Sequence, residues 1–100
     1  MLIMSKENPK SREDYIQLLK GELPVLRAKA RISQEIAAEK IGVTRQTYSA
    51  IETGKRQMSW TMFLALFAYF QNNEQTRLMV EQIFDLSSGT STIIDIPPDK

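Results

Sequence analysis

One stretch of this chain, Ser33–Glu52, constrains its fold more than any other. It predicts two short helices joined by a tight turn. Ser33 is suited to open the first helix, because its hydroxyl can accept a hydrogen bond from a backbone N–H of the opening turn. Gly42 is suited to end that helix, since a residue without a Cβ adopts positive φ at little steric cost. Thr44 is a second capping residue and opens the second helix.

Each of the two predicted helices has an apolar face. Ala37, Ala38 and Ile41 share one face of the first helix. The inward face of the second helix is formed by Tyr48 and Ile51. Its opposite face carries small or polar side chains that are free to touch another molecule, namely Arg45, Gln46, Ser49, Ala50 and Thr53. Two helices joined by a turn containing glycine, the second with a donor-rich face, are typical of a DNA-reading helix-turn-helix.

The segment Leu26–Gln57 resembles the Cro/C1-type (XRE-like) helix-turn-helix family. The resemblance rests on a combination of positions: Ser33-Gln34, Ala38, Gly42, Thr44-Arg45-Gln46-Thr47 and Glu52-x-Gly54-Lys55. With its flanking helices it covers residues 20–70. It implies an all-α, five-helix, lambda-repressor-like DNA-binding domain over residues 11–86. We expect residues 1–10 to be a flexible tail, and residues 87–100 to be either a tail or a dimerisation strand.

Length and composition exclude several other classes of protein. One hundred residues with 42% hydrophobic side chains suit one small globular domain. The absence of cysteine and histidine removes disulfides, thiolate chemistry, Ser-His-Asp catalysis and the usual zinc sites. The N-terminal segment lacks the apolar core of a signal peptide, and the run 60–70 is shorter than the ~20 residues that span a bilayer. We therefore expect a cytoplasmic, non-enzymatic protein with no metal, cofactor, small-molecule ligand or membrane partner.

Charge is distributed unevenly along the chain, although the formal net charge is only +1. Residues 24–56 carry seven lysines and arginines against three acids, whereas residues 57–100 carry two against five. A locally basic segment is what a phosphate backbone attracts. Chance scatter of solvated charge is the alternative interpretation.

The segment before the helix-turn-helix predicts further helix. Ser11 and Asp14 resemble a capping box. Gly21 and Pro24 then interrupt an apolar stripe, so either one helix kinks there, or a short helix ends at Gly21 and a second begins with Pro24 in its first turn. We favour two helices. Arg31 stands where the family usually has glycine, and a left-handed backbone there would cost about 1 kcal/mol.

The second half of the chain predicts two helices and a strand. Ser59 caps a helix that runs from Trp60 to Phe70 or Gln71, and it is apolar nearly all round, so it must be covered nearly all round. A fifth helix after an Asn73 cap, Glu74–Leu86, supplies part of the cover through Leu78, Met79, Ile83 and Phe84. A second subunit could supply the rest. Thr90–Ile96 reads as a short strand that is either disordered or paired with its symmetry mate. The dimerisation candidates are Trp60, Phe67, Ile93 and Ile94.

The resemblance also assigns roles to individual side chains. Base contacts are expected from Arg45, Gln46, Ser49 and Ala50 on the recognition helix, residues 45–53. Phosphate contacts are expected from Gln34, Thr44, Thr47, Lys55 and Arg56. Gln34 should also brace the residue that opens the recognition helix. Structural roles fall to Gly42 and to an ion pair between Arg27 and Glu52.

One pair of positions departs from the family in size. Ala37 replaces a larger residue, and Tyr48 replaces a smaller one. We expect the Tyr48 ring to fill the volume that Ala37 leaves, with its hydroxyl bound to a phosphate or a backbone carbonyl.

Two functions of different classes follow. The first is a sequence-specific transcriptional regulator, more often a repressor by resemblance, that binds double-stranded DNA as a homodimer with reading helices about 34 Å apart. The second is an antitoxin-like or adaptor protein whose main partner is another protein and whose DNA binding is autoregulatory. An enzyme is disfavoured, because the chain offers no set of nucleophile, base and oxyanion donors.

Overall fold

The computed structural model describes residues 11–85, and the regular secondary structure in this range consists of α-helices only. In chain order they are α1 (Arg12–Ala30), α2 (Gln34–Ile41), α3 (Arg45–Glu52), α4 (Trp60–Gln71) and α5 (Arg77–Ile83). The predicted tail at 1–10, the end of the predicted fifth helix at Leu86, and the predicted strand with Ile93 and Ile94 lie outside the described residues. The all-α, five-helix class predicted from the sequence is confirmed within residues 11–85.

Hydroxyl side chains start four of the five helices, as the sequence predicts. Each accepts a hydrogen bond from a backbone N–H in the first turn, and these caps are Ser11, Ser33, Thr44 and Ser59. The Asp14 carboxylate also accepts from the Ser11 N–H at 3.1 Å, which completes the capping box. These bonds satisfy backbone donors that have no partner inside a helix.

Two helices end with a residue in the left-handed conformation. Gly42 ends α2 at φ 77°, as expected of a residue without a β-carbon. Arg31 ends α1 at φ 60°, so it adopts the left-handed conformation that ordinarily favours glycine. We estimate the cost of the Arg31 side chain there at about 1 kcal/mol.

The predicted break in the first helix is wrong, because α1 is continuous and contains Pro24. Proline removes one backbone hydrogen bond and costs about 3 kcal/mol in a helix interior. The apolar stripe explains why the helix continues. Its side chains before and after Pro24 are all buried on one face, and they are Ile16, Leu19, Leu23 and Leu26. Burying four large aliphatic side chains at about 1.5–3 kcal/mol each outweighs that cost.

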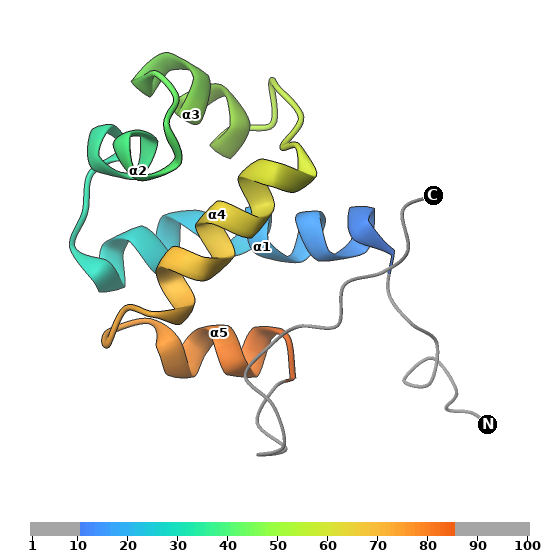
Figure 1. The fold of residues 1–100 in the computed structure, drawn as a ribbon, viewed down its shortest axis with the longest axis vertical. Coiled ribbons are helices and arrows are strands. Elements are labelled where there is room, and N and C mark those ends of the chain that lie inside the picture. Colours follow the sequence, from blue (N-terminus) through green and yellow to red (C-terminus); the bar gives the residue numbers. More distant parts are fainter. Residues whose placement is uncertain (1–10, 86–100) are drawn as a thin grey trace.

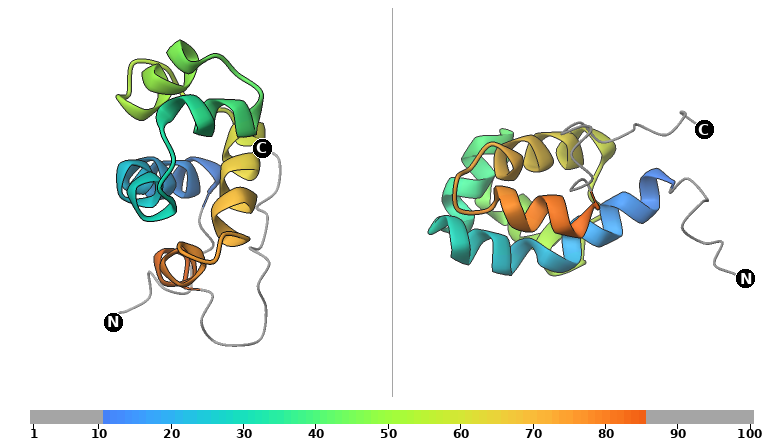
Figure 2. Two further views of the ribbon diagram at one scale, coloured as in Figure 1. Left: turned by 90° about the vertical axis from the view of Figure 1, so that its left-hand side faces the viewer. Right: turned by 90° about the horizontal axis from the view of Figure 1, so that it is seen from below.

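The two helices of the helix-turn-helix lie at one end of the molecule and α5 at the other, with α1 and α4 between them (Figure 1). A quarter turn shows the same order, with α4 beside α1 (Figure 2). The core lies between these elements. Its fully buried large side chains include Leu19 and Leu23 from α1, Tyr48 and Ile51 from α3, and Phe63 and Phe70 from α4. The core thereby fixes α3 against α1, and the opposite face of α3 lies at the outer end of the molecule (Figure 1).

The fifth helix differs from its predicted bounds. It begins at Arg77, because residues 74–76 form a turn anchored by Asn73 and Thr76. The Asn73 Oδ1 atom accepts from the Gln75 N–H at 2.8 Å, and the buried Thr76 hydroxyl donates to the Phe70 carbonyl at 2.7 Å. Asn73 therefore stabilises a turn and does not cap the helix.

The inward side chains of α5 also differ from those predicted. Val80 and Phe84, four residues apart, are buried. Leu78, which we predicted to be inward, is 68% exposed. Met79 and Ile83 are half-buried against the core, as predicted. In none of the helices over residues 11–85 is the apolar run long enough to cross a bilayer.

Candidate nucleic-acid interface

Helix α3 divides into a buried face and an accessible face. Tyr48 and Ile51 are fully buried, as predicted. Arg45 and Gln46, at the N-terminal end, are exposed, and Ser49 and Ala50 are half-buried. Within residues 11–85, the side chains of Arg45 and Gln46 take part in no hydrogen bond or ion pair. All their donors are therefore available to an external partner, and in Figure 1 α3 lies at the outer end of the molecule.

Two threonines sit at the start of α3. The Thr44 hydroxyl accepts from the Thr47 N–H at 3.1 Å and donates its own proton to the Thr47 Oγ1 atom at 3.0 Å. Both roles of Thr44 are thereby occupied inside the protein. The Thr47 hydroxyl only accepts in this arrangement, so its proton remains free to donate to an anion.

An ion pair fixes the other end of α3. The Arg27 Nε atom donates to Glu52 Oε1 at 3.1 Å, and Arg27 Nη2 donates to Glu52 Oε2 at 3.1 Å. Arg27 Nη1 also reaches the Ile32 carbonyl at 3.3 Å. The Glu52 side chain is only 4% exposed. Burial alone would lower the pKa of Arg27, but the hydrogen bonds and charge of Glu52 reverse this and raise it, so the guanidinium stays charged.

Gln34 joins this pair from a third helix. Its Nε2 atom donates to Glu52 Oε1 at 3.1 Å. The sequence resemblance placed this brace at the residue that opens the recognition helix, whereas the structure places it at Glu52, which ends that helix. Glu52 thus binds both α1 and α2, and these polar contacts hold the C-terminal end of α3. The bond between Gln34 and Glu52 could not be predicted from the sequence, because those side chains are brought together only by the packing of α2 on α3.

The Tyr48 hydroxyl is buried without a hydrogen-bond partner in residues 11–85. From the sequence we expect a phosphate or a backbone carbonyl at this hydroxyl. A phosphate cannot reach it, because the residue is fully buried, and no carbonyl bonds to it. Burial raises the pKa of Tyr48 above its ordinary value of 10.0, and the nearby negative charge of Glu52 raises it further. The hydroxyl therefore stays protonated at neutral pH.

The loop after α3 folds back onto the end of that helix. Gly54 adopts φ 87°, and the backbone N–H groups of Lys55 and Arg56 donate to the Ala50 carbonyl at 2.8 and 3.0 Å. These two amides are therefore occupied inside the protein and do not remain for a phosphate. The side chains of Lys55 and Arg56 are exposed and remain available.

The two described dimerisation candidates lie in an aromatic cluster. Trp60 stacks on Phe63 with ring centroids 4.7 Å apart and is half-buried. Phe67 is 7% exposed and meets the edge of Phe84 at 5.3 Å. Intrachain packing thus covers much of the apolar surface of α4, part of which the sequence analysis left to a possible second subunit.

Comparison with known proteins gives one match. A family model described as a helix-turn-helix domain matches residues 19–77, which is more than half of the chain. Searches of curated proteins and of solved structures found no match. The matched range runs from the middle of α1 to the first residue of α5, so it contains both the accessible face of α3 and the polar contacts that hold its C-terminal end.

Proposed function

The chain belongs to the helix-turn-helix domain family, an XRE-like family, and from this premise we propose that it is a sequence-specific transcriptional regulator that reads duplex DNA with α3. One observation carries the proposal. Within residues 11–85, the N-terminal end of α3 presents Arg45 and Gln46 with every side-chain donor unengaged, while its C-terminal end is held by Glu52. A helix fixed at one end with free donors at the other is suited to enter the major groove.

The two exposed side chains match the chemistry of base edges. Arginine donates two parallel hydrogen bonds to the O6 and N7 atoms of guanine, and glutamine pairs with the N6 and N7 atoms of adenine. Each such contact discriminates against other bases by about 1–3 kcal/mol. Ser49 and Ala50 lie farther along the same helix and are half-buried, so they add a short hydroxyl and a methyl contact. Arg45 and Gln46 therefore carry most of the proposed base reading.

Phosphate contacts would come from the elements on either side of α3. Lys55 and Arg56 present exposed cations in the loop after it, and Thr47 has a free hydroxyl proton at its first turn. Gln34 keeps one N–H of its amide beyond the bond to Glu52. Thr44 contributes by positioning Thr47, because its own hydroxyl is occupied. These contacts would set the register of the helix on the duplex without reading sequence.

We further propose that the protein acts in the cytoplasm as a two-fold homodimer and represses by occupying a promoter. In a two-fold complex the reading helices lie about one helical turn of DNA apart, ~34 Å, so the preferred site should be a near-palindrome with that spacing.

The rival proposal, an antitoxin-like or adaptor protein, would draw support from an exposed aromatic patch on α4. Within residues 11–85 the large exposed hydrophobic side chains are Val25, Ile36 and Leu78, and none of them belongs to α4. This distribution favours DNA reading as the main activity.

Selection of preferred sites from random duplexes tests the proposed function. We expect the full chain to enrich one short near-palindromic sequence at two salt concentrations, with overall affinity lower at the higher salt. A pool without sequence preference at both concentrations would show that the protein does not read sequence. A lone half-site would contradict the dimer.

A further inference from the structure

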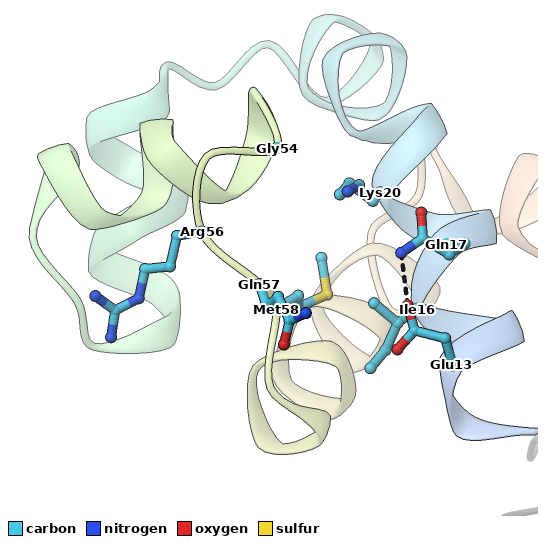
Figure 3. A pocket seen from close by; sticks show the side chains of 8 residues that line it. All are labelled: Glu13, Ile16, Gln17, Lys20, Gly54, Arg56, Gln57 and Met58. Atoms are coloured by element: carbon cyan, nitrogen blue, oxygen red, sulfur yellow. Dashed lines mark hydrogen bonds between the residues drawn. The ribbon is translucent and has the colours of Figure 1, made fainter.

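A small pocket lies between α1 and the loop that joins α3 to α4. We call it the α1–loop pocket, and its volume is about 30 Å³, which is the space of a single water molecule or one anionic oxygen. Figure 3 shows it from close by, with the loop on one side and α1 on the other. It is lined by Glu13, Ile16, Gln17, Lys20, Gly54, Arg56, Gln57 and Met58. No role predicted from the sequence involves Lys20 or Gln57.

Lys20 supplies an unpaired positive charge to this pocket. Its ammonium nitrogen lies 3.9 Å from the point that a β-carbon on Gly54 would occupy, so it sits over the loop. The residue is half-buried, and over residues 11–85 it takes part in no ion pair or hydrogen bond. A partly desolvated ammonium without a counter-ion attracts an external anion more strongly than a fully solvated one.

An acidic group, Glu13, also lines the pocket, but no ion pair joins its carboxylate to Lys20 within residues 11–85. The Glu13 carboxylate is exposed and accepts from the Gln17 Nε2 atom at 2.7 Å, one turn along α1. Figure 3 shows the Arg56 side chain pointing away from the pocket. The backbone N–H of exposed Gln57 donates to no acceptor within residues 11–85. The lining of the α1–loop pocket therefore includes one cation without a counter-ion and one residue whose backbone N–H has no acceptor, both judged within residues 11–85.

We propose that the α1–loop pocket binds a phosphodiester oxygen of the DNA backbone, with Lys20 as the cation and the Gln57 amide as a hydrogen-bond donor. This inference rests on the proposed function, because it extends the DNA interface from the exposed loop side chains Lys55 and Arg56 onto α1. The pocket admits one oxygen while the rest of the phosphate stays outside. Such a contact positions the protein on the duplex and reads no base.

Lys20→Ala in the full chain tests the assignment, with Lys29→Ala as the matched control. Lys29 is an exposed lysine on the same helix, nine residues farther on. We would measure binding to the selected duplex by fluorescence anisotropy over a range of salt concentrations. Lys20→Ala should weaken binding about five- to tenfold at ~0.1 M salt and reduce the slope of log K against log salt by about one. Lys20→Arg should retain both values, and thermal melts should confirm that every variant is folded.

Each alternative result has a definite meaning. If the wild type binds the duplex and Lys20→Ala keeps its affinity and slope, the pocket assignment is overturned and the proposed function stands. Equal losses in Lys20→Ala and Lys29→Ala would overturn it too, because the effect would then come from overall charge. Inorganic phosphate at matched ionic strength should displace DNA more readily from the wild type than from Lys20→Ala, and equal displacement from both proteins would overturn the assignment. A wild type that binds no duplex overturns both proposals.

Discussion

Helices α3 and α4 both begin behind a hydroxyl cap, but different forces hold them in the fold. Four aromatic or aliphatic side chains of α4 are buried, and stacked rings surround Phe63. Only two side chains of α3 are buried, and polar bonds from Arg27 and Gln34 to Glu52 hold its end. A helix that presents one face to a partner has less surface to pack, so polar contacts set its angle. We therefore expect the stability of the domain to depend most on α4, and the proposed reading of DNA to depend on α3.

The largest expected effect comes from the aromatic side of this comparison. Phe63→Ala removes a fully buried ring that stacks on Trp60 at 4.7 Å and meets Phe84 at 6.0 Å. We expect the free energy of unfolding to fall by about 3–5 kcal/mol, measured by urea denaturation. Leu78→Ala, at an exposed position of α5, is the control and should change stability by less than about 0.5 kcal/mol. Similar losses in the two variants would mean that the ring cluster does not stabilise the domain.

We call the bonds from Arg27 and Gln34 to Glu52 the polar anchor of α3. Breaking it should lower stability less than Phe63→Ala does, and should lower affinity for DNA more. Glu52→Ala leaves the Arg27 guanidinium and the Gln34 amide without their acceptor. We expect about 2–3 kcal/mol of destabilisation, below the usual 3–5 for a broken buried pair because Arg27 keeps a fifth of its side chain exposed.

The same variant should also lose affinity for the selected duplex by more than its unfolded fraction explains. Denaturation curves and binding curves at one temperature provide the comparison. Full affinity in the folded fraction would show that the anchor does not orient α3.

The next effect concerns binding alone. Gln46→Ala removes an exposed side chain, so stability should stay within about 0.5 kcal/mol. Affinity for the selected duplex should fall by about 1–3 kcal/mol, with little change on random DNA. Lys55→Ala is the matched control for a phosphate contact, and it should weaken binding to both DNAs and lower the salt slope by about one. Equal losses of Gln46→Ala on both DNAs would exclude base reading by this side chain.

The smallest effect on stability is expected from removing the buried Tyr48 hydroxyl. Tyr48→Phe keeps the ring and removes a hydroxyl that has no partner in residues 11–85, so stability at pH 7 should stay the same or rise by up to about 1 kcal/mol.

The contribution of the Tyr48 hydroxyl can be measured from how the stability of the wild type changes with pH. Its pKa is raised in the folded state, so the protonated hydroxyl favours folding, and that stability is present below about pH 10 and is lost as pH rises further. The loss from this group approaches about 1.4 kcal/mol per pH unit. We would plot the free energy of unfolding, from denaturation curves, against pH from 9 to about 11. This plot should be flatter for Tyr48→Phe than for Tyr69→Phe, the matched tyrosine variant on α4. Parallel curves would show that the Tyr48 hydroxyl titrates as it does in the unfolded chain.

The sequence predicted well those features that depend on neighbouring residues. Ser33, Thr44 and Ser59 were identifiable as caps because a hydroxyl before a helix bonds to the backbone three residues later. The inward face of α3 followed from helical spacing. The accessible positions of Arg45 and Gln46 followed from the same spacing, because they lie opposite that inward face.

Features that depend on distant contacts were not predicted. The continuity of α1 through Pro24 depends on the burial of Leu23 and Leu26 against other helices. The start of α5 at Arg77 depends on the bond from Thr76 to the Phe70 carbonyl. The bond from Gln34 to Glu52 and the position of Lys20 over Gly54 likewise require the tertiary fold. No sequence signal marked these pairs.

The central claim is that the N-terminal face of α3 reads base pairs. Repeating the selection from random duplexes with the double variant Arg45→Ala/Gln46→Ala tests it most directly. We predict that the enriched sequence loses its preference at adjacent base pairs in each half-site, while the spacing of the half-sites and the salt dependence persist. The same enriched sequence from the wild type and the double variant would contradict the claim.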